Sequence, residues 1–142
     1  MYHVLLPFDG SAHSENALQH VIAMKQHCGS LKVTLVCIAE LPYMHGDAVT
    51  VSMTDNIGHN LIDNARRTLA GAQERLEAAG VEVDTYVEAD DPARAIAEQA
   101  ETRQCDAIVM GTRGLGRISE LVLGSVAYKT VHLTKIPVTL VQ

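Results

Sequence analysis

Residues 106–126 read DAIVMGTRGLGRISELVLGSV, and this stretch joins a buried strand to a helix through a loop with several glycines. Its first part, Asp106–Met110, is a short apolar run typical of a strand that is buried on both faces. Gly111 and Gly114 follow, and after nine more residues Gly124 opens a segment with helical spacing of apolar positions. A helix start leaves backbone N–H groups without partners at the positive end of the helix dipole. The stretch therefore predicts a strand–loop–helix unit that holds an anion, for which phosphate is the best candidate.

A purely structural interpretation of these glycines is open as well. Gly111 could serve only to end the strand in a turn, and Gly124 only to cap the helix that follows. The functional interpretation gains because the three glycines share one strand–loop–helix unit, with the hydroxyl of Ser125 at the helix start.

The rest of the chain alternates between apolar runs and helical patterns. We expect strands at Tyr2–Phe8, Lys32–Ala39, Val81–Val87, Ala107–Met110 and Pro137–Val141, and helices from Ser11 to about Cys28, Thr54 to Ala79, Asp91 to about Arg103 and Ser125 to Thr134. Residues 40–55 predict irregular structure. Strands that alternate with helices through short links pair in parallel, with right-handed crossovers. The sequence therefore predicts a single α/β domain over residues 1–142, with a doubly wound, Rossmann-like sheet of five parallel strands and helices on both faces.

The apolar character of each strand predicts its place in this sheet. The strands at 2–8 and 107–110 have the most continuous apolar runs, so we expect them to be central neighbours. Their carboxyl ends carry Asp9 and Gly111, which would meet at the crevice where such sheets bind ligands. Asp9 also has a structural interpretation, since the Asp of an Asp-Gly-Ser turn bonds its own backbone. The strand at 81–87 alternates polar and apolar residues and predicts one sheet edge.

Composition limits the classes of partner. The chain has 142 residues, a formal charge of −6, and no apolar run long enough to span a membrane. Nucleic acid and anionic membranes both require a basic face, so we expect neither as the main partner. The N-terminus lacks the layout of a signal peptide, and we expect a soluble, cytoplasmic protein.

The seven histidines and three cysteines do not predict a metal site. His13, His20 and His27 lie seven residues apart on one predicted helix, so neighbours are about 10 Å apart along its axis, too far to share an ion. We expect them on a polar helix face. The cysteines are odd in number and form no Cys-x-x-Cys pair, which predicts buried, reduced thiols.

Several enzyme classes lack their sequence patterns here. There is no Gly-x-Ser-x-Gly elbow, no P-loop pattern, and no dinucleotide-binding glycine pattern after the first strand, where Asp9-Gly10-Ser11 stands instead. A phosphoacceptor receiver domain would need an acidic pair at that place and an Asp at the end of the third strand. The chain has one acid at the first place and Val87-Glu88 at the second.

The spacing Gly111-x2-Gly114-x9-Gly124-Ser125 resembles the ATP-binding motif of the universal stress protein family. The opening residues 4–11, VLLPFDGS, and the closing Ile136-Pro137-Val138 resemble that family's first and last strands. The likeness covers the chain except residues 40–56. It implies a fold of the adenine nucleotide alpha hydrolase-like type and a cytoplasmic ATP-binding protein of the stress response, often dimeric through the last strand.

The resemblance also implies the contacts of an adenine nucleotide. The predicted nucleotide-binding residues are Pro7, Phe8, Asp9, Ile38, Met110, Gly111, Thr112, Arg113, Gly114, Gly124, Ser125 and Val126. Within this set Asp9 would take the ribose and Ile38 the adenine, while the glycine loop and the helix start would close on the phosphates. Phe8 is bulkier than the residue expected there, and a ring pointing into the pocket would argue against adenine.

Two functions stay open at this point. The first is a nucleotide-responsive binding module whose ATP occupancy changes assembly or partner choice, and the residues favour it. The second is a slow ATP hydrolase or phosphotransferase that uses the same site, although no residue is predicted to be catalytic and the need for Mg²⁺ is open. The strand Pro137–Val141 carries no charge and should lie at the sheet edge opposite the strand at 81–87, which predicts a homodimer paired through it.

Overall fold

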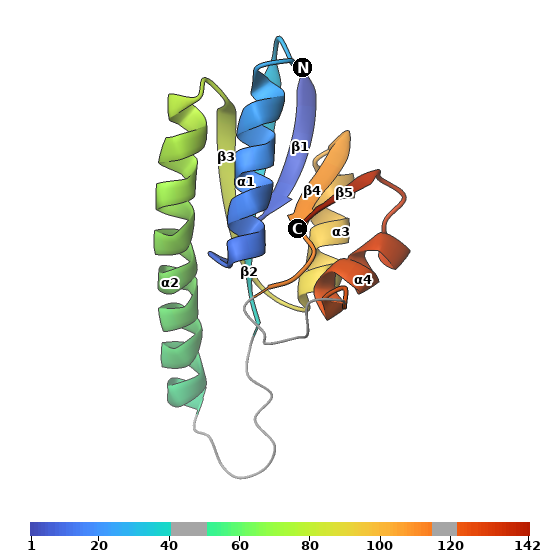
Figure 1. Ribbon diagram of the computed structural model, residues 1–142. Helices are drawn as coiled ribbons and strands as arrows, with labels where there is room; N and C mark the ends of the chain where they lie inside the picture. The colour runs from blue at the N-terminus through green and yellow to red at the C-terminus, as the bar shows by residue number, and fades with distance from the viewer. Residues whose placement is uncertain (41–50, 115–121) are drawn as a thin grey trace.

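The computed structural model describes residues 1–40, 51–114 and 122–142, with the side chains of residues 51–56 excepted. Strands and helices alternate along the chain (Figure 1). In order they are β1 (Tyr2–Pro7), α1 (Ala12–Lys25), β2 (Leu31–Ala39), α2 (Val51–Ala78), β3 (Glu82–Ala89), α3 (Pro92–Thr102), β4 (Ala107–Gly111), α4 (Ser125–Leu133) and β5 (Val138–Val141). The predicted irregular segment at 41–50 and the middle of the glycine loop, residues 115–121, lie outside the described residues.

The five strands form one parallel sheet in the order β3-β2-β1-β4-β5. The chain first builds outward from β1 through β2 to β3, and then returns to the other side of β1 to build β4 and β5. The strand order therefore reverses between β1 and β4, which are neighbours as predicted. The predicted edge strands, β3 and β5, are also confirmed. Ligands of such sheets bind outside the carboxyl ends of the strands at this reversal.

Helices cover both faces of the sheet, which confirms the doubly wound architecture (Figure 1). On one face α1 and α2 pack against side chains of β1 and β2 such as Val4, Leu6 and Leu35, all fully buried. On the other face α3 and α4 pack against Leu5 and Ile108. Because successive side chains of a strand point to opposite faces, β1 contributes to both cores, which explains its continuous apolar run.

Several predicted boundaries differ from the structure by one to three residues, among them the starts of α2 and β5 and the end of α1. Helix α2 begins at Val51, so the prediction of irregular structure was wrong for residues 51–55; neither glycine nor proline stands between Val51 and Ile57 to stop a helix. Helix α1 ends at Lys25, so His27 lies beyond it and the predicted face of three helical histidines was wrong for its last member. Strand β5 begins at Val138, because the preceding proline has no N–H to donate to a ladder.

Candidate nucleotide-binding site

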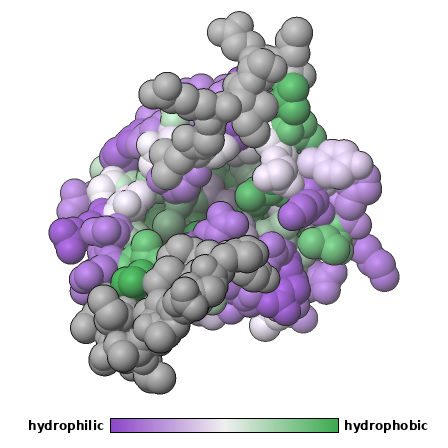
Figure 2. Space-filling view, turned by 90° about the horizontal axis from the view of Figure 1, so that it is seen from below, coloured by the Kyte–Doolittle hydropathy of each residue, from purple (hydrophilic) through white to green (hydrophobic). Residues whose placement is uncertain are grey.

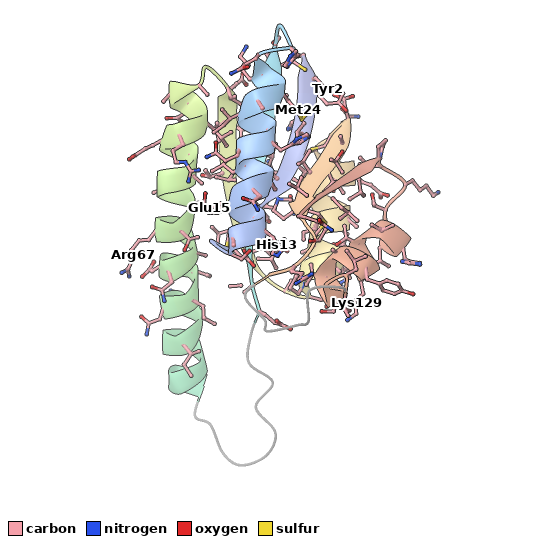
Figure 3. The ribbon with its side chains drawn as sticks, viewed as in Figure 1. Tyr2, His13, Glu15, Met24, Arg67 and Lys129 are labelled. Atoms are coloured by element: carbon pink, nitrogen blue, oxygen red, sulfur yellow. The ribbon has the colours of Figure 1, made fainter. Side chains whose placement is uncertain are left out.

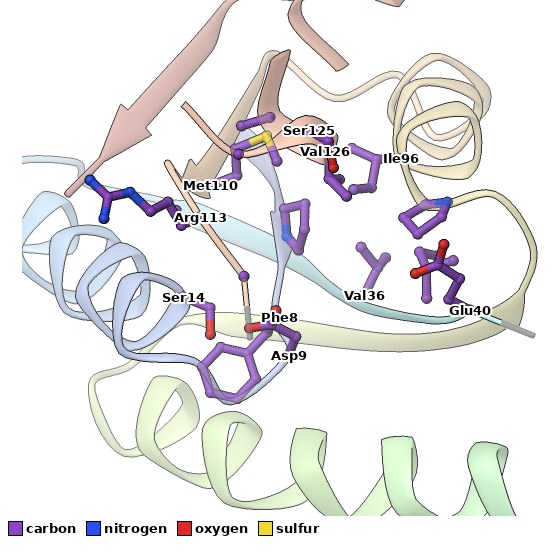
Figure 4. A pocket seen from close by; sticks show the side chains of 17 residues that line it. Phe8, Asp9, Ser14, Val36, Glu40, Ile96, Met110, Arg113, Ser125 and Val126 are labelled. Carbon is purple, nitrogen blue, oxygen red and sulfur yellow. The ribbon is translucent and has the colours of Figure 1, made fainter. Parts of the chain in front are cut away.

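A cavity of about 460 Å³ opens at the carboxyl ends of β2, β1 and β4. Figure 2 looks onto this end of the molecule, where hydrophobic surface shows at the centre among hydrophilic residues. The residues that line the cavity are Pro7, Phe8, Asp9, Ser14, Val36, Ile38, Glu40, Pro92, Ile96, Met110, Gly111, Arg113, Gly114, Gly124, Ser125, Val126 and Ala127 (Figure 4). The cavity thus lies where the strand order reverses.

The cavity gathers every predicted nucleotide-binding residue except Thr112. The described lining adds Ser14, Val36, Glu40, Pro92, Ile96 and Ala127, which the sequence prediction did not include. Two signals could have found some of them. Side chains two residues from Ile38 share its side of β2, and helix starts in a doubly wound fold point to the carboxyl edge of the sheet.

Asp9 follows β1 and contacts both its own turn and the glycine loop. Its Oδ1 accepts a hydrogen bond from the backbone N–H of Ser11 at 2.9 Å, so the structural interpretation as a turn residue holds. Its Oδ2 lies against Gly114, because a Cβ placed on that glycine would be 2.8 Å from this oxygen. Both roles are therefore compatible: one carboxylate oxygen holds the turn, and the other lies at the cavity wall.

Three helix N-termini meet at this cavity, those of α1, α3 and α4, and they are capped differently. Ser11 caps α1 by accepting from the N–H of Ser14, and Asp91 caps α3 by accepting from the N–H of Arg94. Helix α4 has Gly124 at its N-cap and no side-chain cap hydrogen bond. Within the described residues no side chain caps its first-turn N–H groups, which lie at the positive end of the helix dipole. This is the best anion site that the cavity offers.

Gly111 has a packing role in addition to its place in the cavity lining. It is the last residue of β4, and a Cβ there would lie 2.7 Å from the backbone carbonyl carbon of His13. The glycine therefore allows the first turn of α1 to pack directly on the end of β4. The close approach is between two parts of the backbone.

The loop between β4 and α4 is also tightly packed at Gly124. A Cβ at this position would lie 3.0 Å from the carbonyl oxygen of Thr112 and 3.1 Å from Cα of Arg113. The N–H of Gly124 donates to that same Thr112 oxygen at 2.7 Å. The glycine thus brings the start of α4 back against the end of β4, which positions the free N–H groups at the cavity.

Thr112 lies outside the cavity lining and contacts three elements instead: β5, the start of α4 and α1. Its N–H donates to the carbonyl of Val141 in β5 at 2.9 Å, and its carbonyl accepts from Gly124 at the start of α4. Its hydroxyl lies 3.2 Å from Nδ1 of His13. Figure 3 shows His13 at the end of α1 that faces this loop. Thr112 therefore couples the loop to α1 and to the edge strand.

The ring of Phe8 belongs to the core. Phe8 is 4% exposed and packs in the hydrophobic core with Leu69 of α2 and Leu18 of α1. In Figure 4 the ring points toward α2, on the opposite side from Ile96 and Val126. The feature that would have argued against adenine is therefore not present.

The backbone of β2 continues past the end of its ladder with β1. That ladder ends at the pair of Pro7 with Val36, where the Val36 carbonyl accepts from the N–H of Phe8 at 2.8 Å. Peptide groups two residues apart face the same side of a strand. The N–H and C=O of Ile38 accordingly face the space beyond β1, at the cavity.

The thiol of Cys37, a residue of β2 influenced by Asp9, is not an activated nucleophile. Burial, with the Asp9 carboxylate adding to it, raises the pKa of the Cys37 thiol to about 11, so this cysteine is a neutral thiol at pH 7. Cys28, Cys37 and Cys105 are free cysteines, the last two buried. Across the described residues, no three His, Cys, Asp or Glu side chains are grouped so that they could hold a metal ion. Nor is any described helix long and apolar enough to cross a membrane.

Fold and cavity define a doubly wound α/β protein whose ligand crevice is built around one uncapped helix N-terminus. A model of the universal stress protein family matches residues 1–142, and the chain belongs to that family. The universal stress protein Sll1388 of Synechocystis is 28% identical over 149 residues, which span 98% of this chain and 96% of that protein.

Solved structures share the fold over nearly the whole chain. Protein MJ0577 of Methanocaldococcus jannaschii superposes with a TM-score of 0.88 at 26% identity, covering 98% of this chain and 94% of its own. A universal stress protein in complex with cAMP gives a TM-score of 0.67 at 21% identity, with 99% and 96% covered. A family protein from Arabidopsis thaliana with AMP bound gives 0.74 at 15% identity, with 99% and 91% covered.

Proposed function

We propose that this protein binds an adenine nucleotide, ATP in particular, in the cavity between β1 and β4 and acts as a nucleotide-responsive module of the stress response. The observation that carries the proposal is the uncapped N-terminus of α4, which faces the same cavity as Asp9. Two proteins of this fold hold AMP or cAMP, which supports an adenine nucleotide as the ligand.

The order of the strands matches the order of the parts of a nucleotide. Neighbouring strands are about 4.8 Å apart, so β4, β1 and β2 offer three adjacent positions along the crevice. Phosphates would lie at Gly124 and Ser125, the ribose at Asp9 just after β1, and the base at Ile38 on β2. The tight contacts of Gly114 and Gly124 show that larger side chains do not fit in this loop without displacing Asp9 or the backbone.

Calorimetric titration with ATP tests the phosphate position through a Ser125→Pro variant. Proline at the first position of a helix removes one free N–H and preserves the helix. Gly124 already has φ −61° and ψ 151°, which suit a residue before proline. We expect ATP affinity to fall at least tenfold in Ser125→Pro and less in Ser125→Ala, which removes only the hydroxyl. Equal affinities in all three proteins would contradict the proposal.

Assembly is part of the proposed function. Strand β5 is an edge strand without charged residues, and Leu140 within it is 36% exposed. Exposed apolar side chains of α4 lie close in sequence: Tyr128, Val131 and Leu133. We infer a cytoplasmic homodimer paired through β5, since unpaired strand edges are normally covered.

The alternative activity, slow hydrolysis or transfer of the γ-phosphate, shares this site and is tested separately. In the described cavity lining the carboxylates are those of Asp9 and Glu40, and Asp9 is assigned to the ribose. Release of inorganic phosphate from ATP, followed with and without Mg²⁺, distinguishes an enzyme from a binding module. A binding module leaves bound ATP intact over many hours.

A further inference from the structure

The base end of the cavity carries one carboxylate among apolar side chains. Val36 and Ile38 are alternate residues of β2, so their side chains share one side of the strand. Glu40 directly follows the last residue of β2, and all three residues line the cavity. Opposite them, α3 contributes Pro92 and Ile96. The Glu40 side chain is exposed at the cavity rim.

The other ionisable groups of the described lining lie toward the glycine loop. Asp9 lies against Gly114, and Arg113 belongs to the loop itself, where its Nε donates to the carbonyl of Val122. Figure 4 shows the Glu40 carboxylate on the side of Val36, away from Arg113. A carboxylate only accepts hydrogen bonds, so Glu40 favours a ligand with an N–H donor at this end.

We propose that Glu40 accepts a hydrogen bond from the exocyclic amino group of a 6-aminopurine and thereby selects adenine over 6-oxopurines. This inference rests on the proposed function, because it requires phosphates at α4 and the ribose at Asp9. With those parts held, the base lies over β2 and its edge furthest from the sugar faces Glu40. An amino group at position 6 donates to the carboxylate, whereas a carbonyl oxygen there sets its lone pairs against the negative charge.

The test compares ATP with purine riboside triphosphate, which lacks only the 6-amino group, and with inosine triphosphate. Calorimetric affinities are measured for the wild-type protein, Glu40→Ala, Glu40→Gln and the control Glu101→Gln. Glu101 is an exposed acid in the last turn of α3, so the control removes an equal charge away from the cavity. Removing a negative charge from the protein strengthens the binding of any triphosphate. The ratio of the affinities for ATP and for its deamino analogue is not changed by this general effect, because both ligands carry the same triphosphate.

We expect the wild-type protein and Glu101→Gln to prefer ATP over the deamino analogue about tenfold, the size of a hydrogen bond to a charged group. In Glu40→Ala the preference falls close to one, and in Glu40→Gln inosine triphosphate gains affinity relative to ATP. An unchanged preference in Glu40→Ala, with ATP still bound, overturns the role of Glu40 and leaves the proposed function standing. Absence of ATP binding to the wild-type protein overturns both.

Discussion

At the scale of single residues, Asp9 carries both a structural and a proposed ligand-binding role. Its Oδ1 holds the Ser11 N–H, so replacement by alanine would damage the turn as well as the site. Replacement by asparagine keeps an oxygen acceptor for the turn and removes the negative charge. Asp9→Asn is therefore the variant that isolates the contact with the ribose.

We expect Asp9→Asn to weaken ATP binding by about 1.5 kcal/mol or more, as for a hydrogen bond to a charged acceptor. Binding of 2′,3′-dideoxy-ATP should change much less, because that ligand has no ribose hydroxyl to donate. Calorimetry with both ligands measures the difference. Equal losses for both ligands would show that Asp9 acts on another part of the nucleotide or on a metal ion.

His3 makes the stability of the fold depend on pH. Its Nε2 lies 2.8 Å from the hydroxyl of Thr34 and 3.7 Å from Sγ of Cys105. Burial, followed by the nearby Lys32 ammonium, lowers the pKa of His3 below its usual value. The unfolded chain therefore takes up this proton at a higher pH than the folded protein. The free energy of unfolding must decrease as the pH falls through about 6.5 toward the folded pKa.

We expect His3→Gln to reduce this loss of stability between about pH 7.5 and pH 5.5, measured by urea unfolding at both values. His20→Gln serves as the control, because His20 is exposed on α1. The control should lose as much stability on acidification as the wild-type protein. A His3→Gln protein that loses the same amount would exclude His3 as the source.

At the scale of elements, the glycine loop affects ligand binding through its contact with the Asp9 carboxylate. A Cβ on Gly114 would displace the Asp9 carboxylate, whose other oxygen is held by Ser11. Gly114→Ala should therefore weaken ATP binding by more than tenfold, or about 1.4 kcal/mol. Gly29→Ala is the matched control, because a Cβ there meets nothing within 4 Å.

If Gly114→Ala weakens ATP binding by displacing Asp9, the losses of affinity caused by Gly114→Ala and by replacement of Asp9 should not add. In a double-mutant cycle, Gly114→Ala should cost little further affinity once Asp9 has been replaced by alanine. Fully additive losses would show that Gly114 contacts the ligand directly.

Helix α2 allows a prediction about stability that is independent of any ligand. Gly71 lies in the interior of this helix, and a Cβ there would meet nothing within 4 Å. Gly71→Ala should raise the free energy of unfolding by about 0.5–1 kcal/mol. Gly80 has φ +78°, a conformation that an alanine adopts only with strain, so Gly80→Ala should lower it. Urea unfolding measures the free energy of unfolding of both variants. A Gly71→Ala protein less stable than the wild type would contradict the open space found around Gly71.

Sequence patterns predicted the elements and strand neighbours because burial on both faces leaves a continuous apolar run, as at Leu5 of β1. They could not predict why Gly111 is a glycine, since its partner, the backbone of His13, is distant in sequence. The contact between His13 and Thr112 could not be predicted either, because these residues are also distant in sequence. The place of Glu40 in the cavity lining was missed because an acidic residue after an apolar strand predicts the start of a loop. Its position two residues after Ile38 was the signal that could have indicated it.

At the scale of the whole molecule, the proposed nucleotide site and the edge strand are connected through hydrogen bonds. Thr112 donates to Val141 of β5 and accepts from Gly124, so one residue joins the strand edge to the α4 start. A ligand at α4 that shifts this residue would also shift β5. Occupancy of the cavity is therefore expected to change pairing through β5.

We expect the protein to be a dimer at micromolar concentration by light scattering, and Thr139→Lys to make it a monomer. Thr139 is exposed on β5, and lysine on an edge strand opposes pairing. ATP should change the dissociation constant of the wild-type dimer. A monomeric wild-type protein would contradict the dimer, whereas a dissociation constant that ignores ATP would contradict only the coupling.

A crystal structure of the protein grown with ATP tests the central claim most directly. We expect phosphate oxygens within hydrogen-bond reach of the N–H groups of Ser125 and Val126, the ribose at Asp9 and the base over Ile38. A nucleotide bound elsewhere, or one in the cavity with its phosphates directed at β2 and its base at α4, would contradict it.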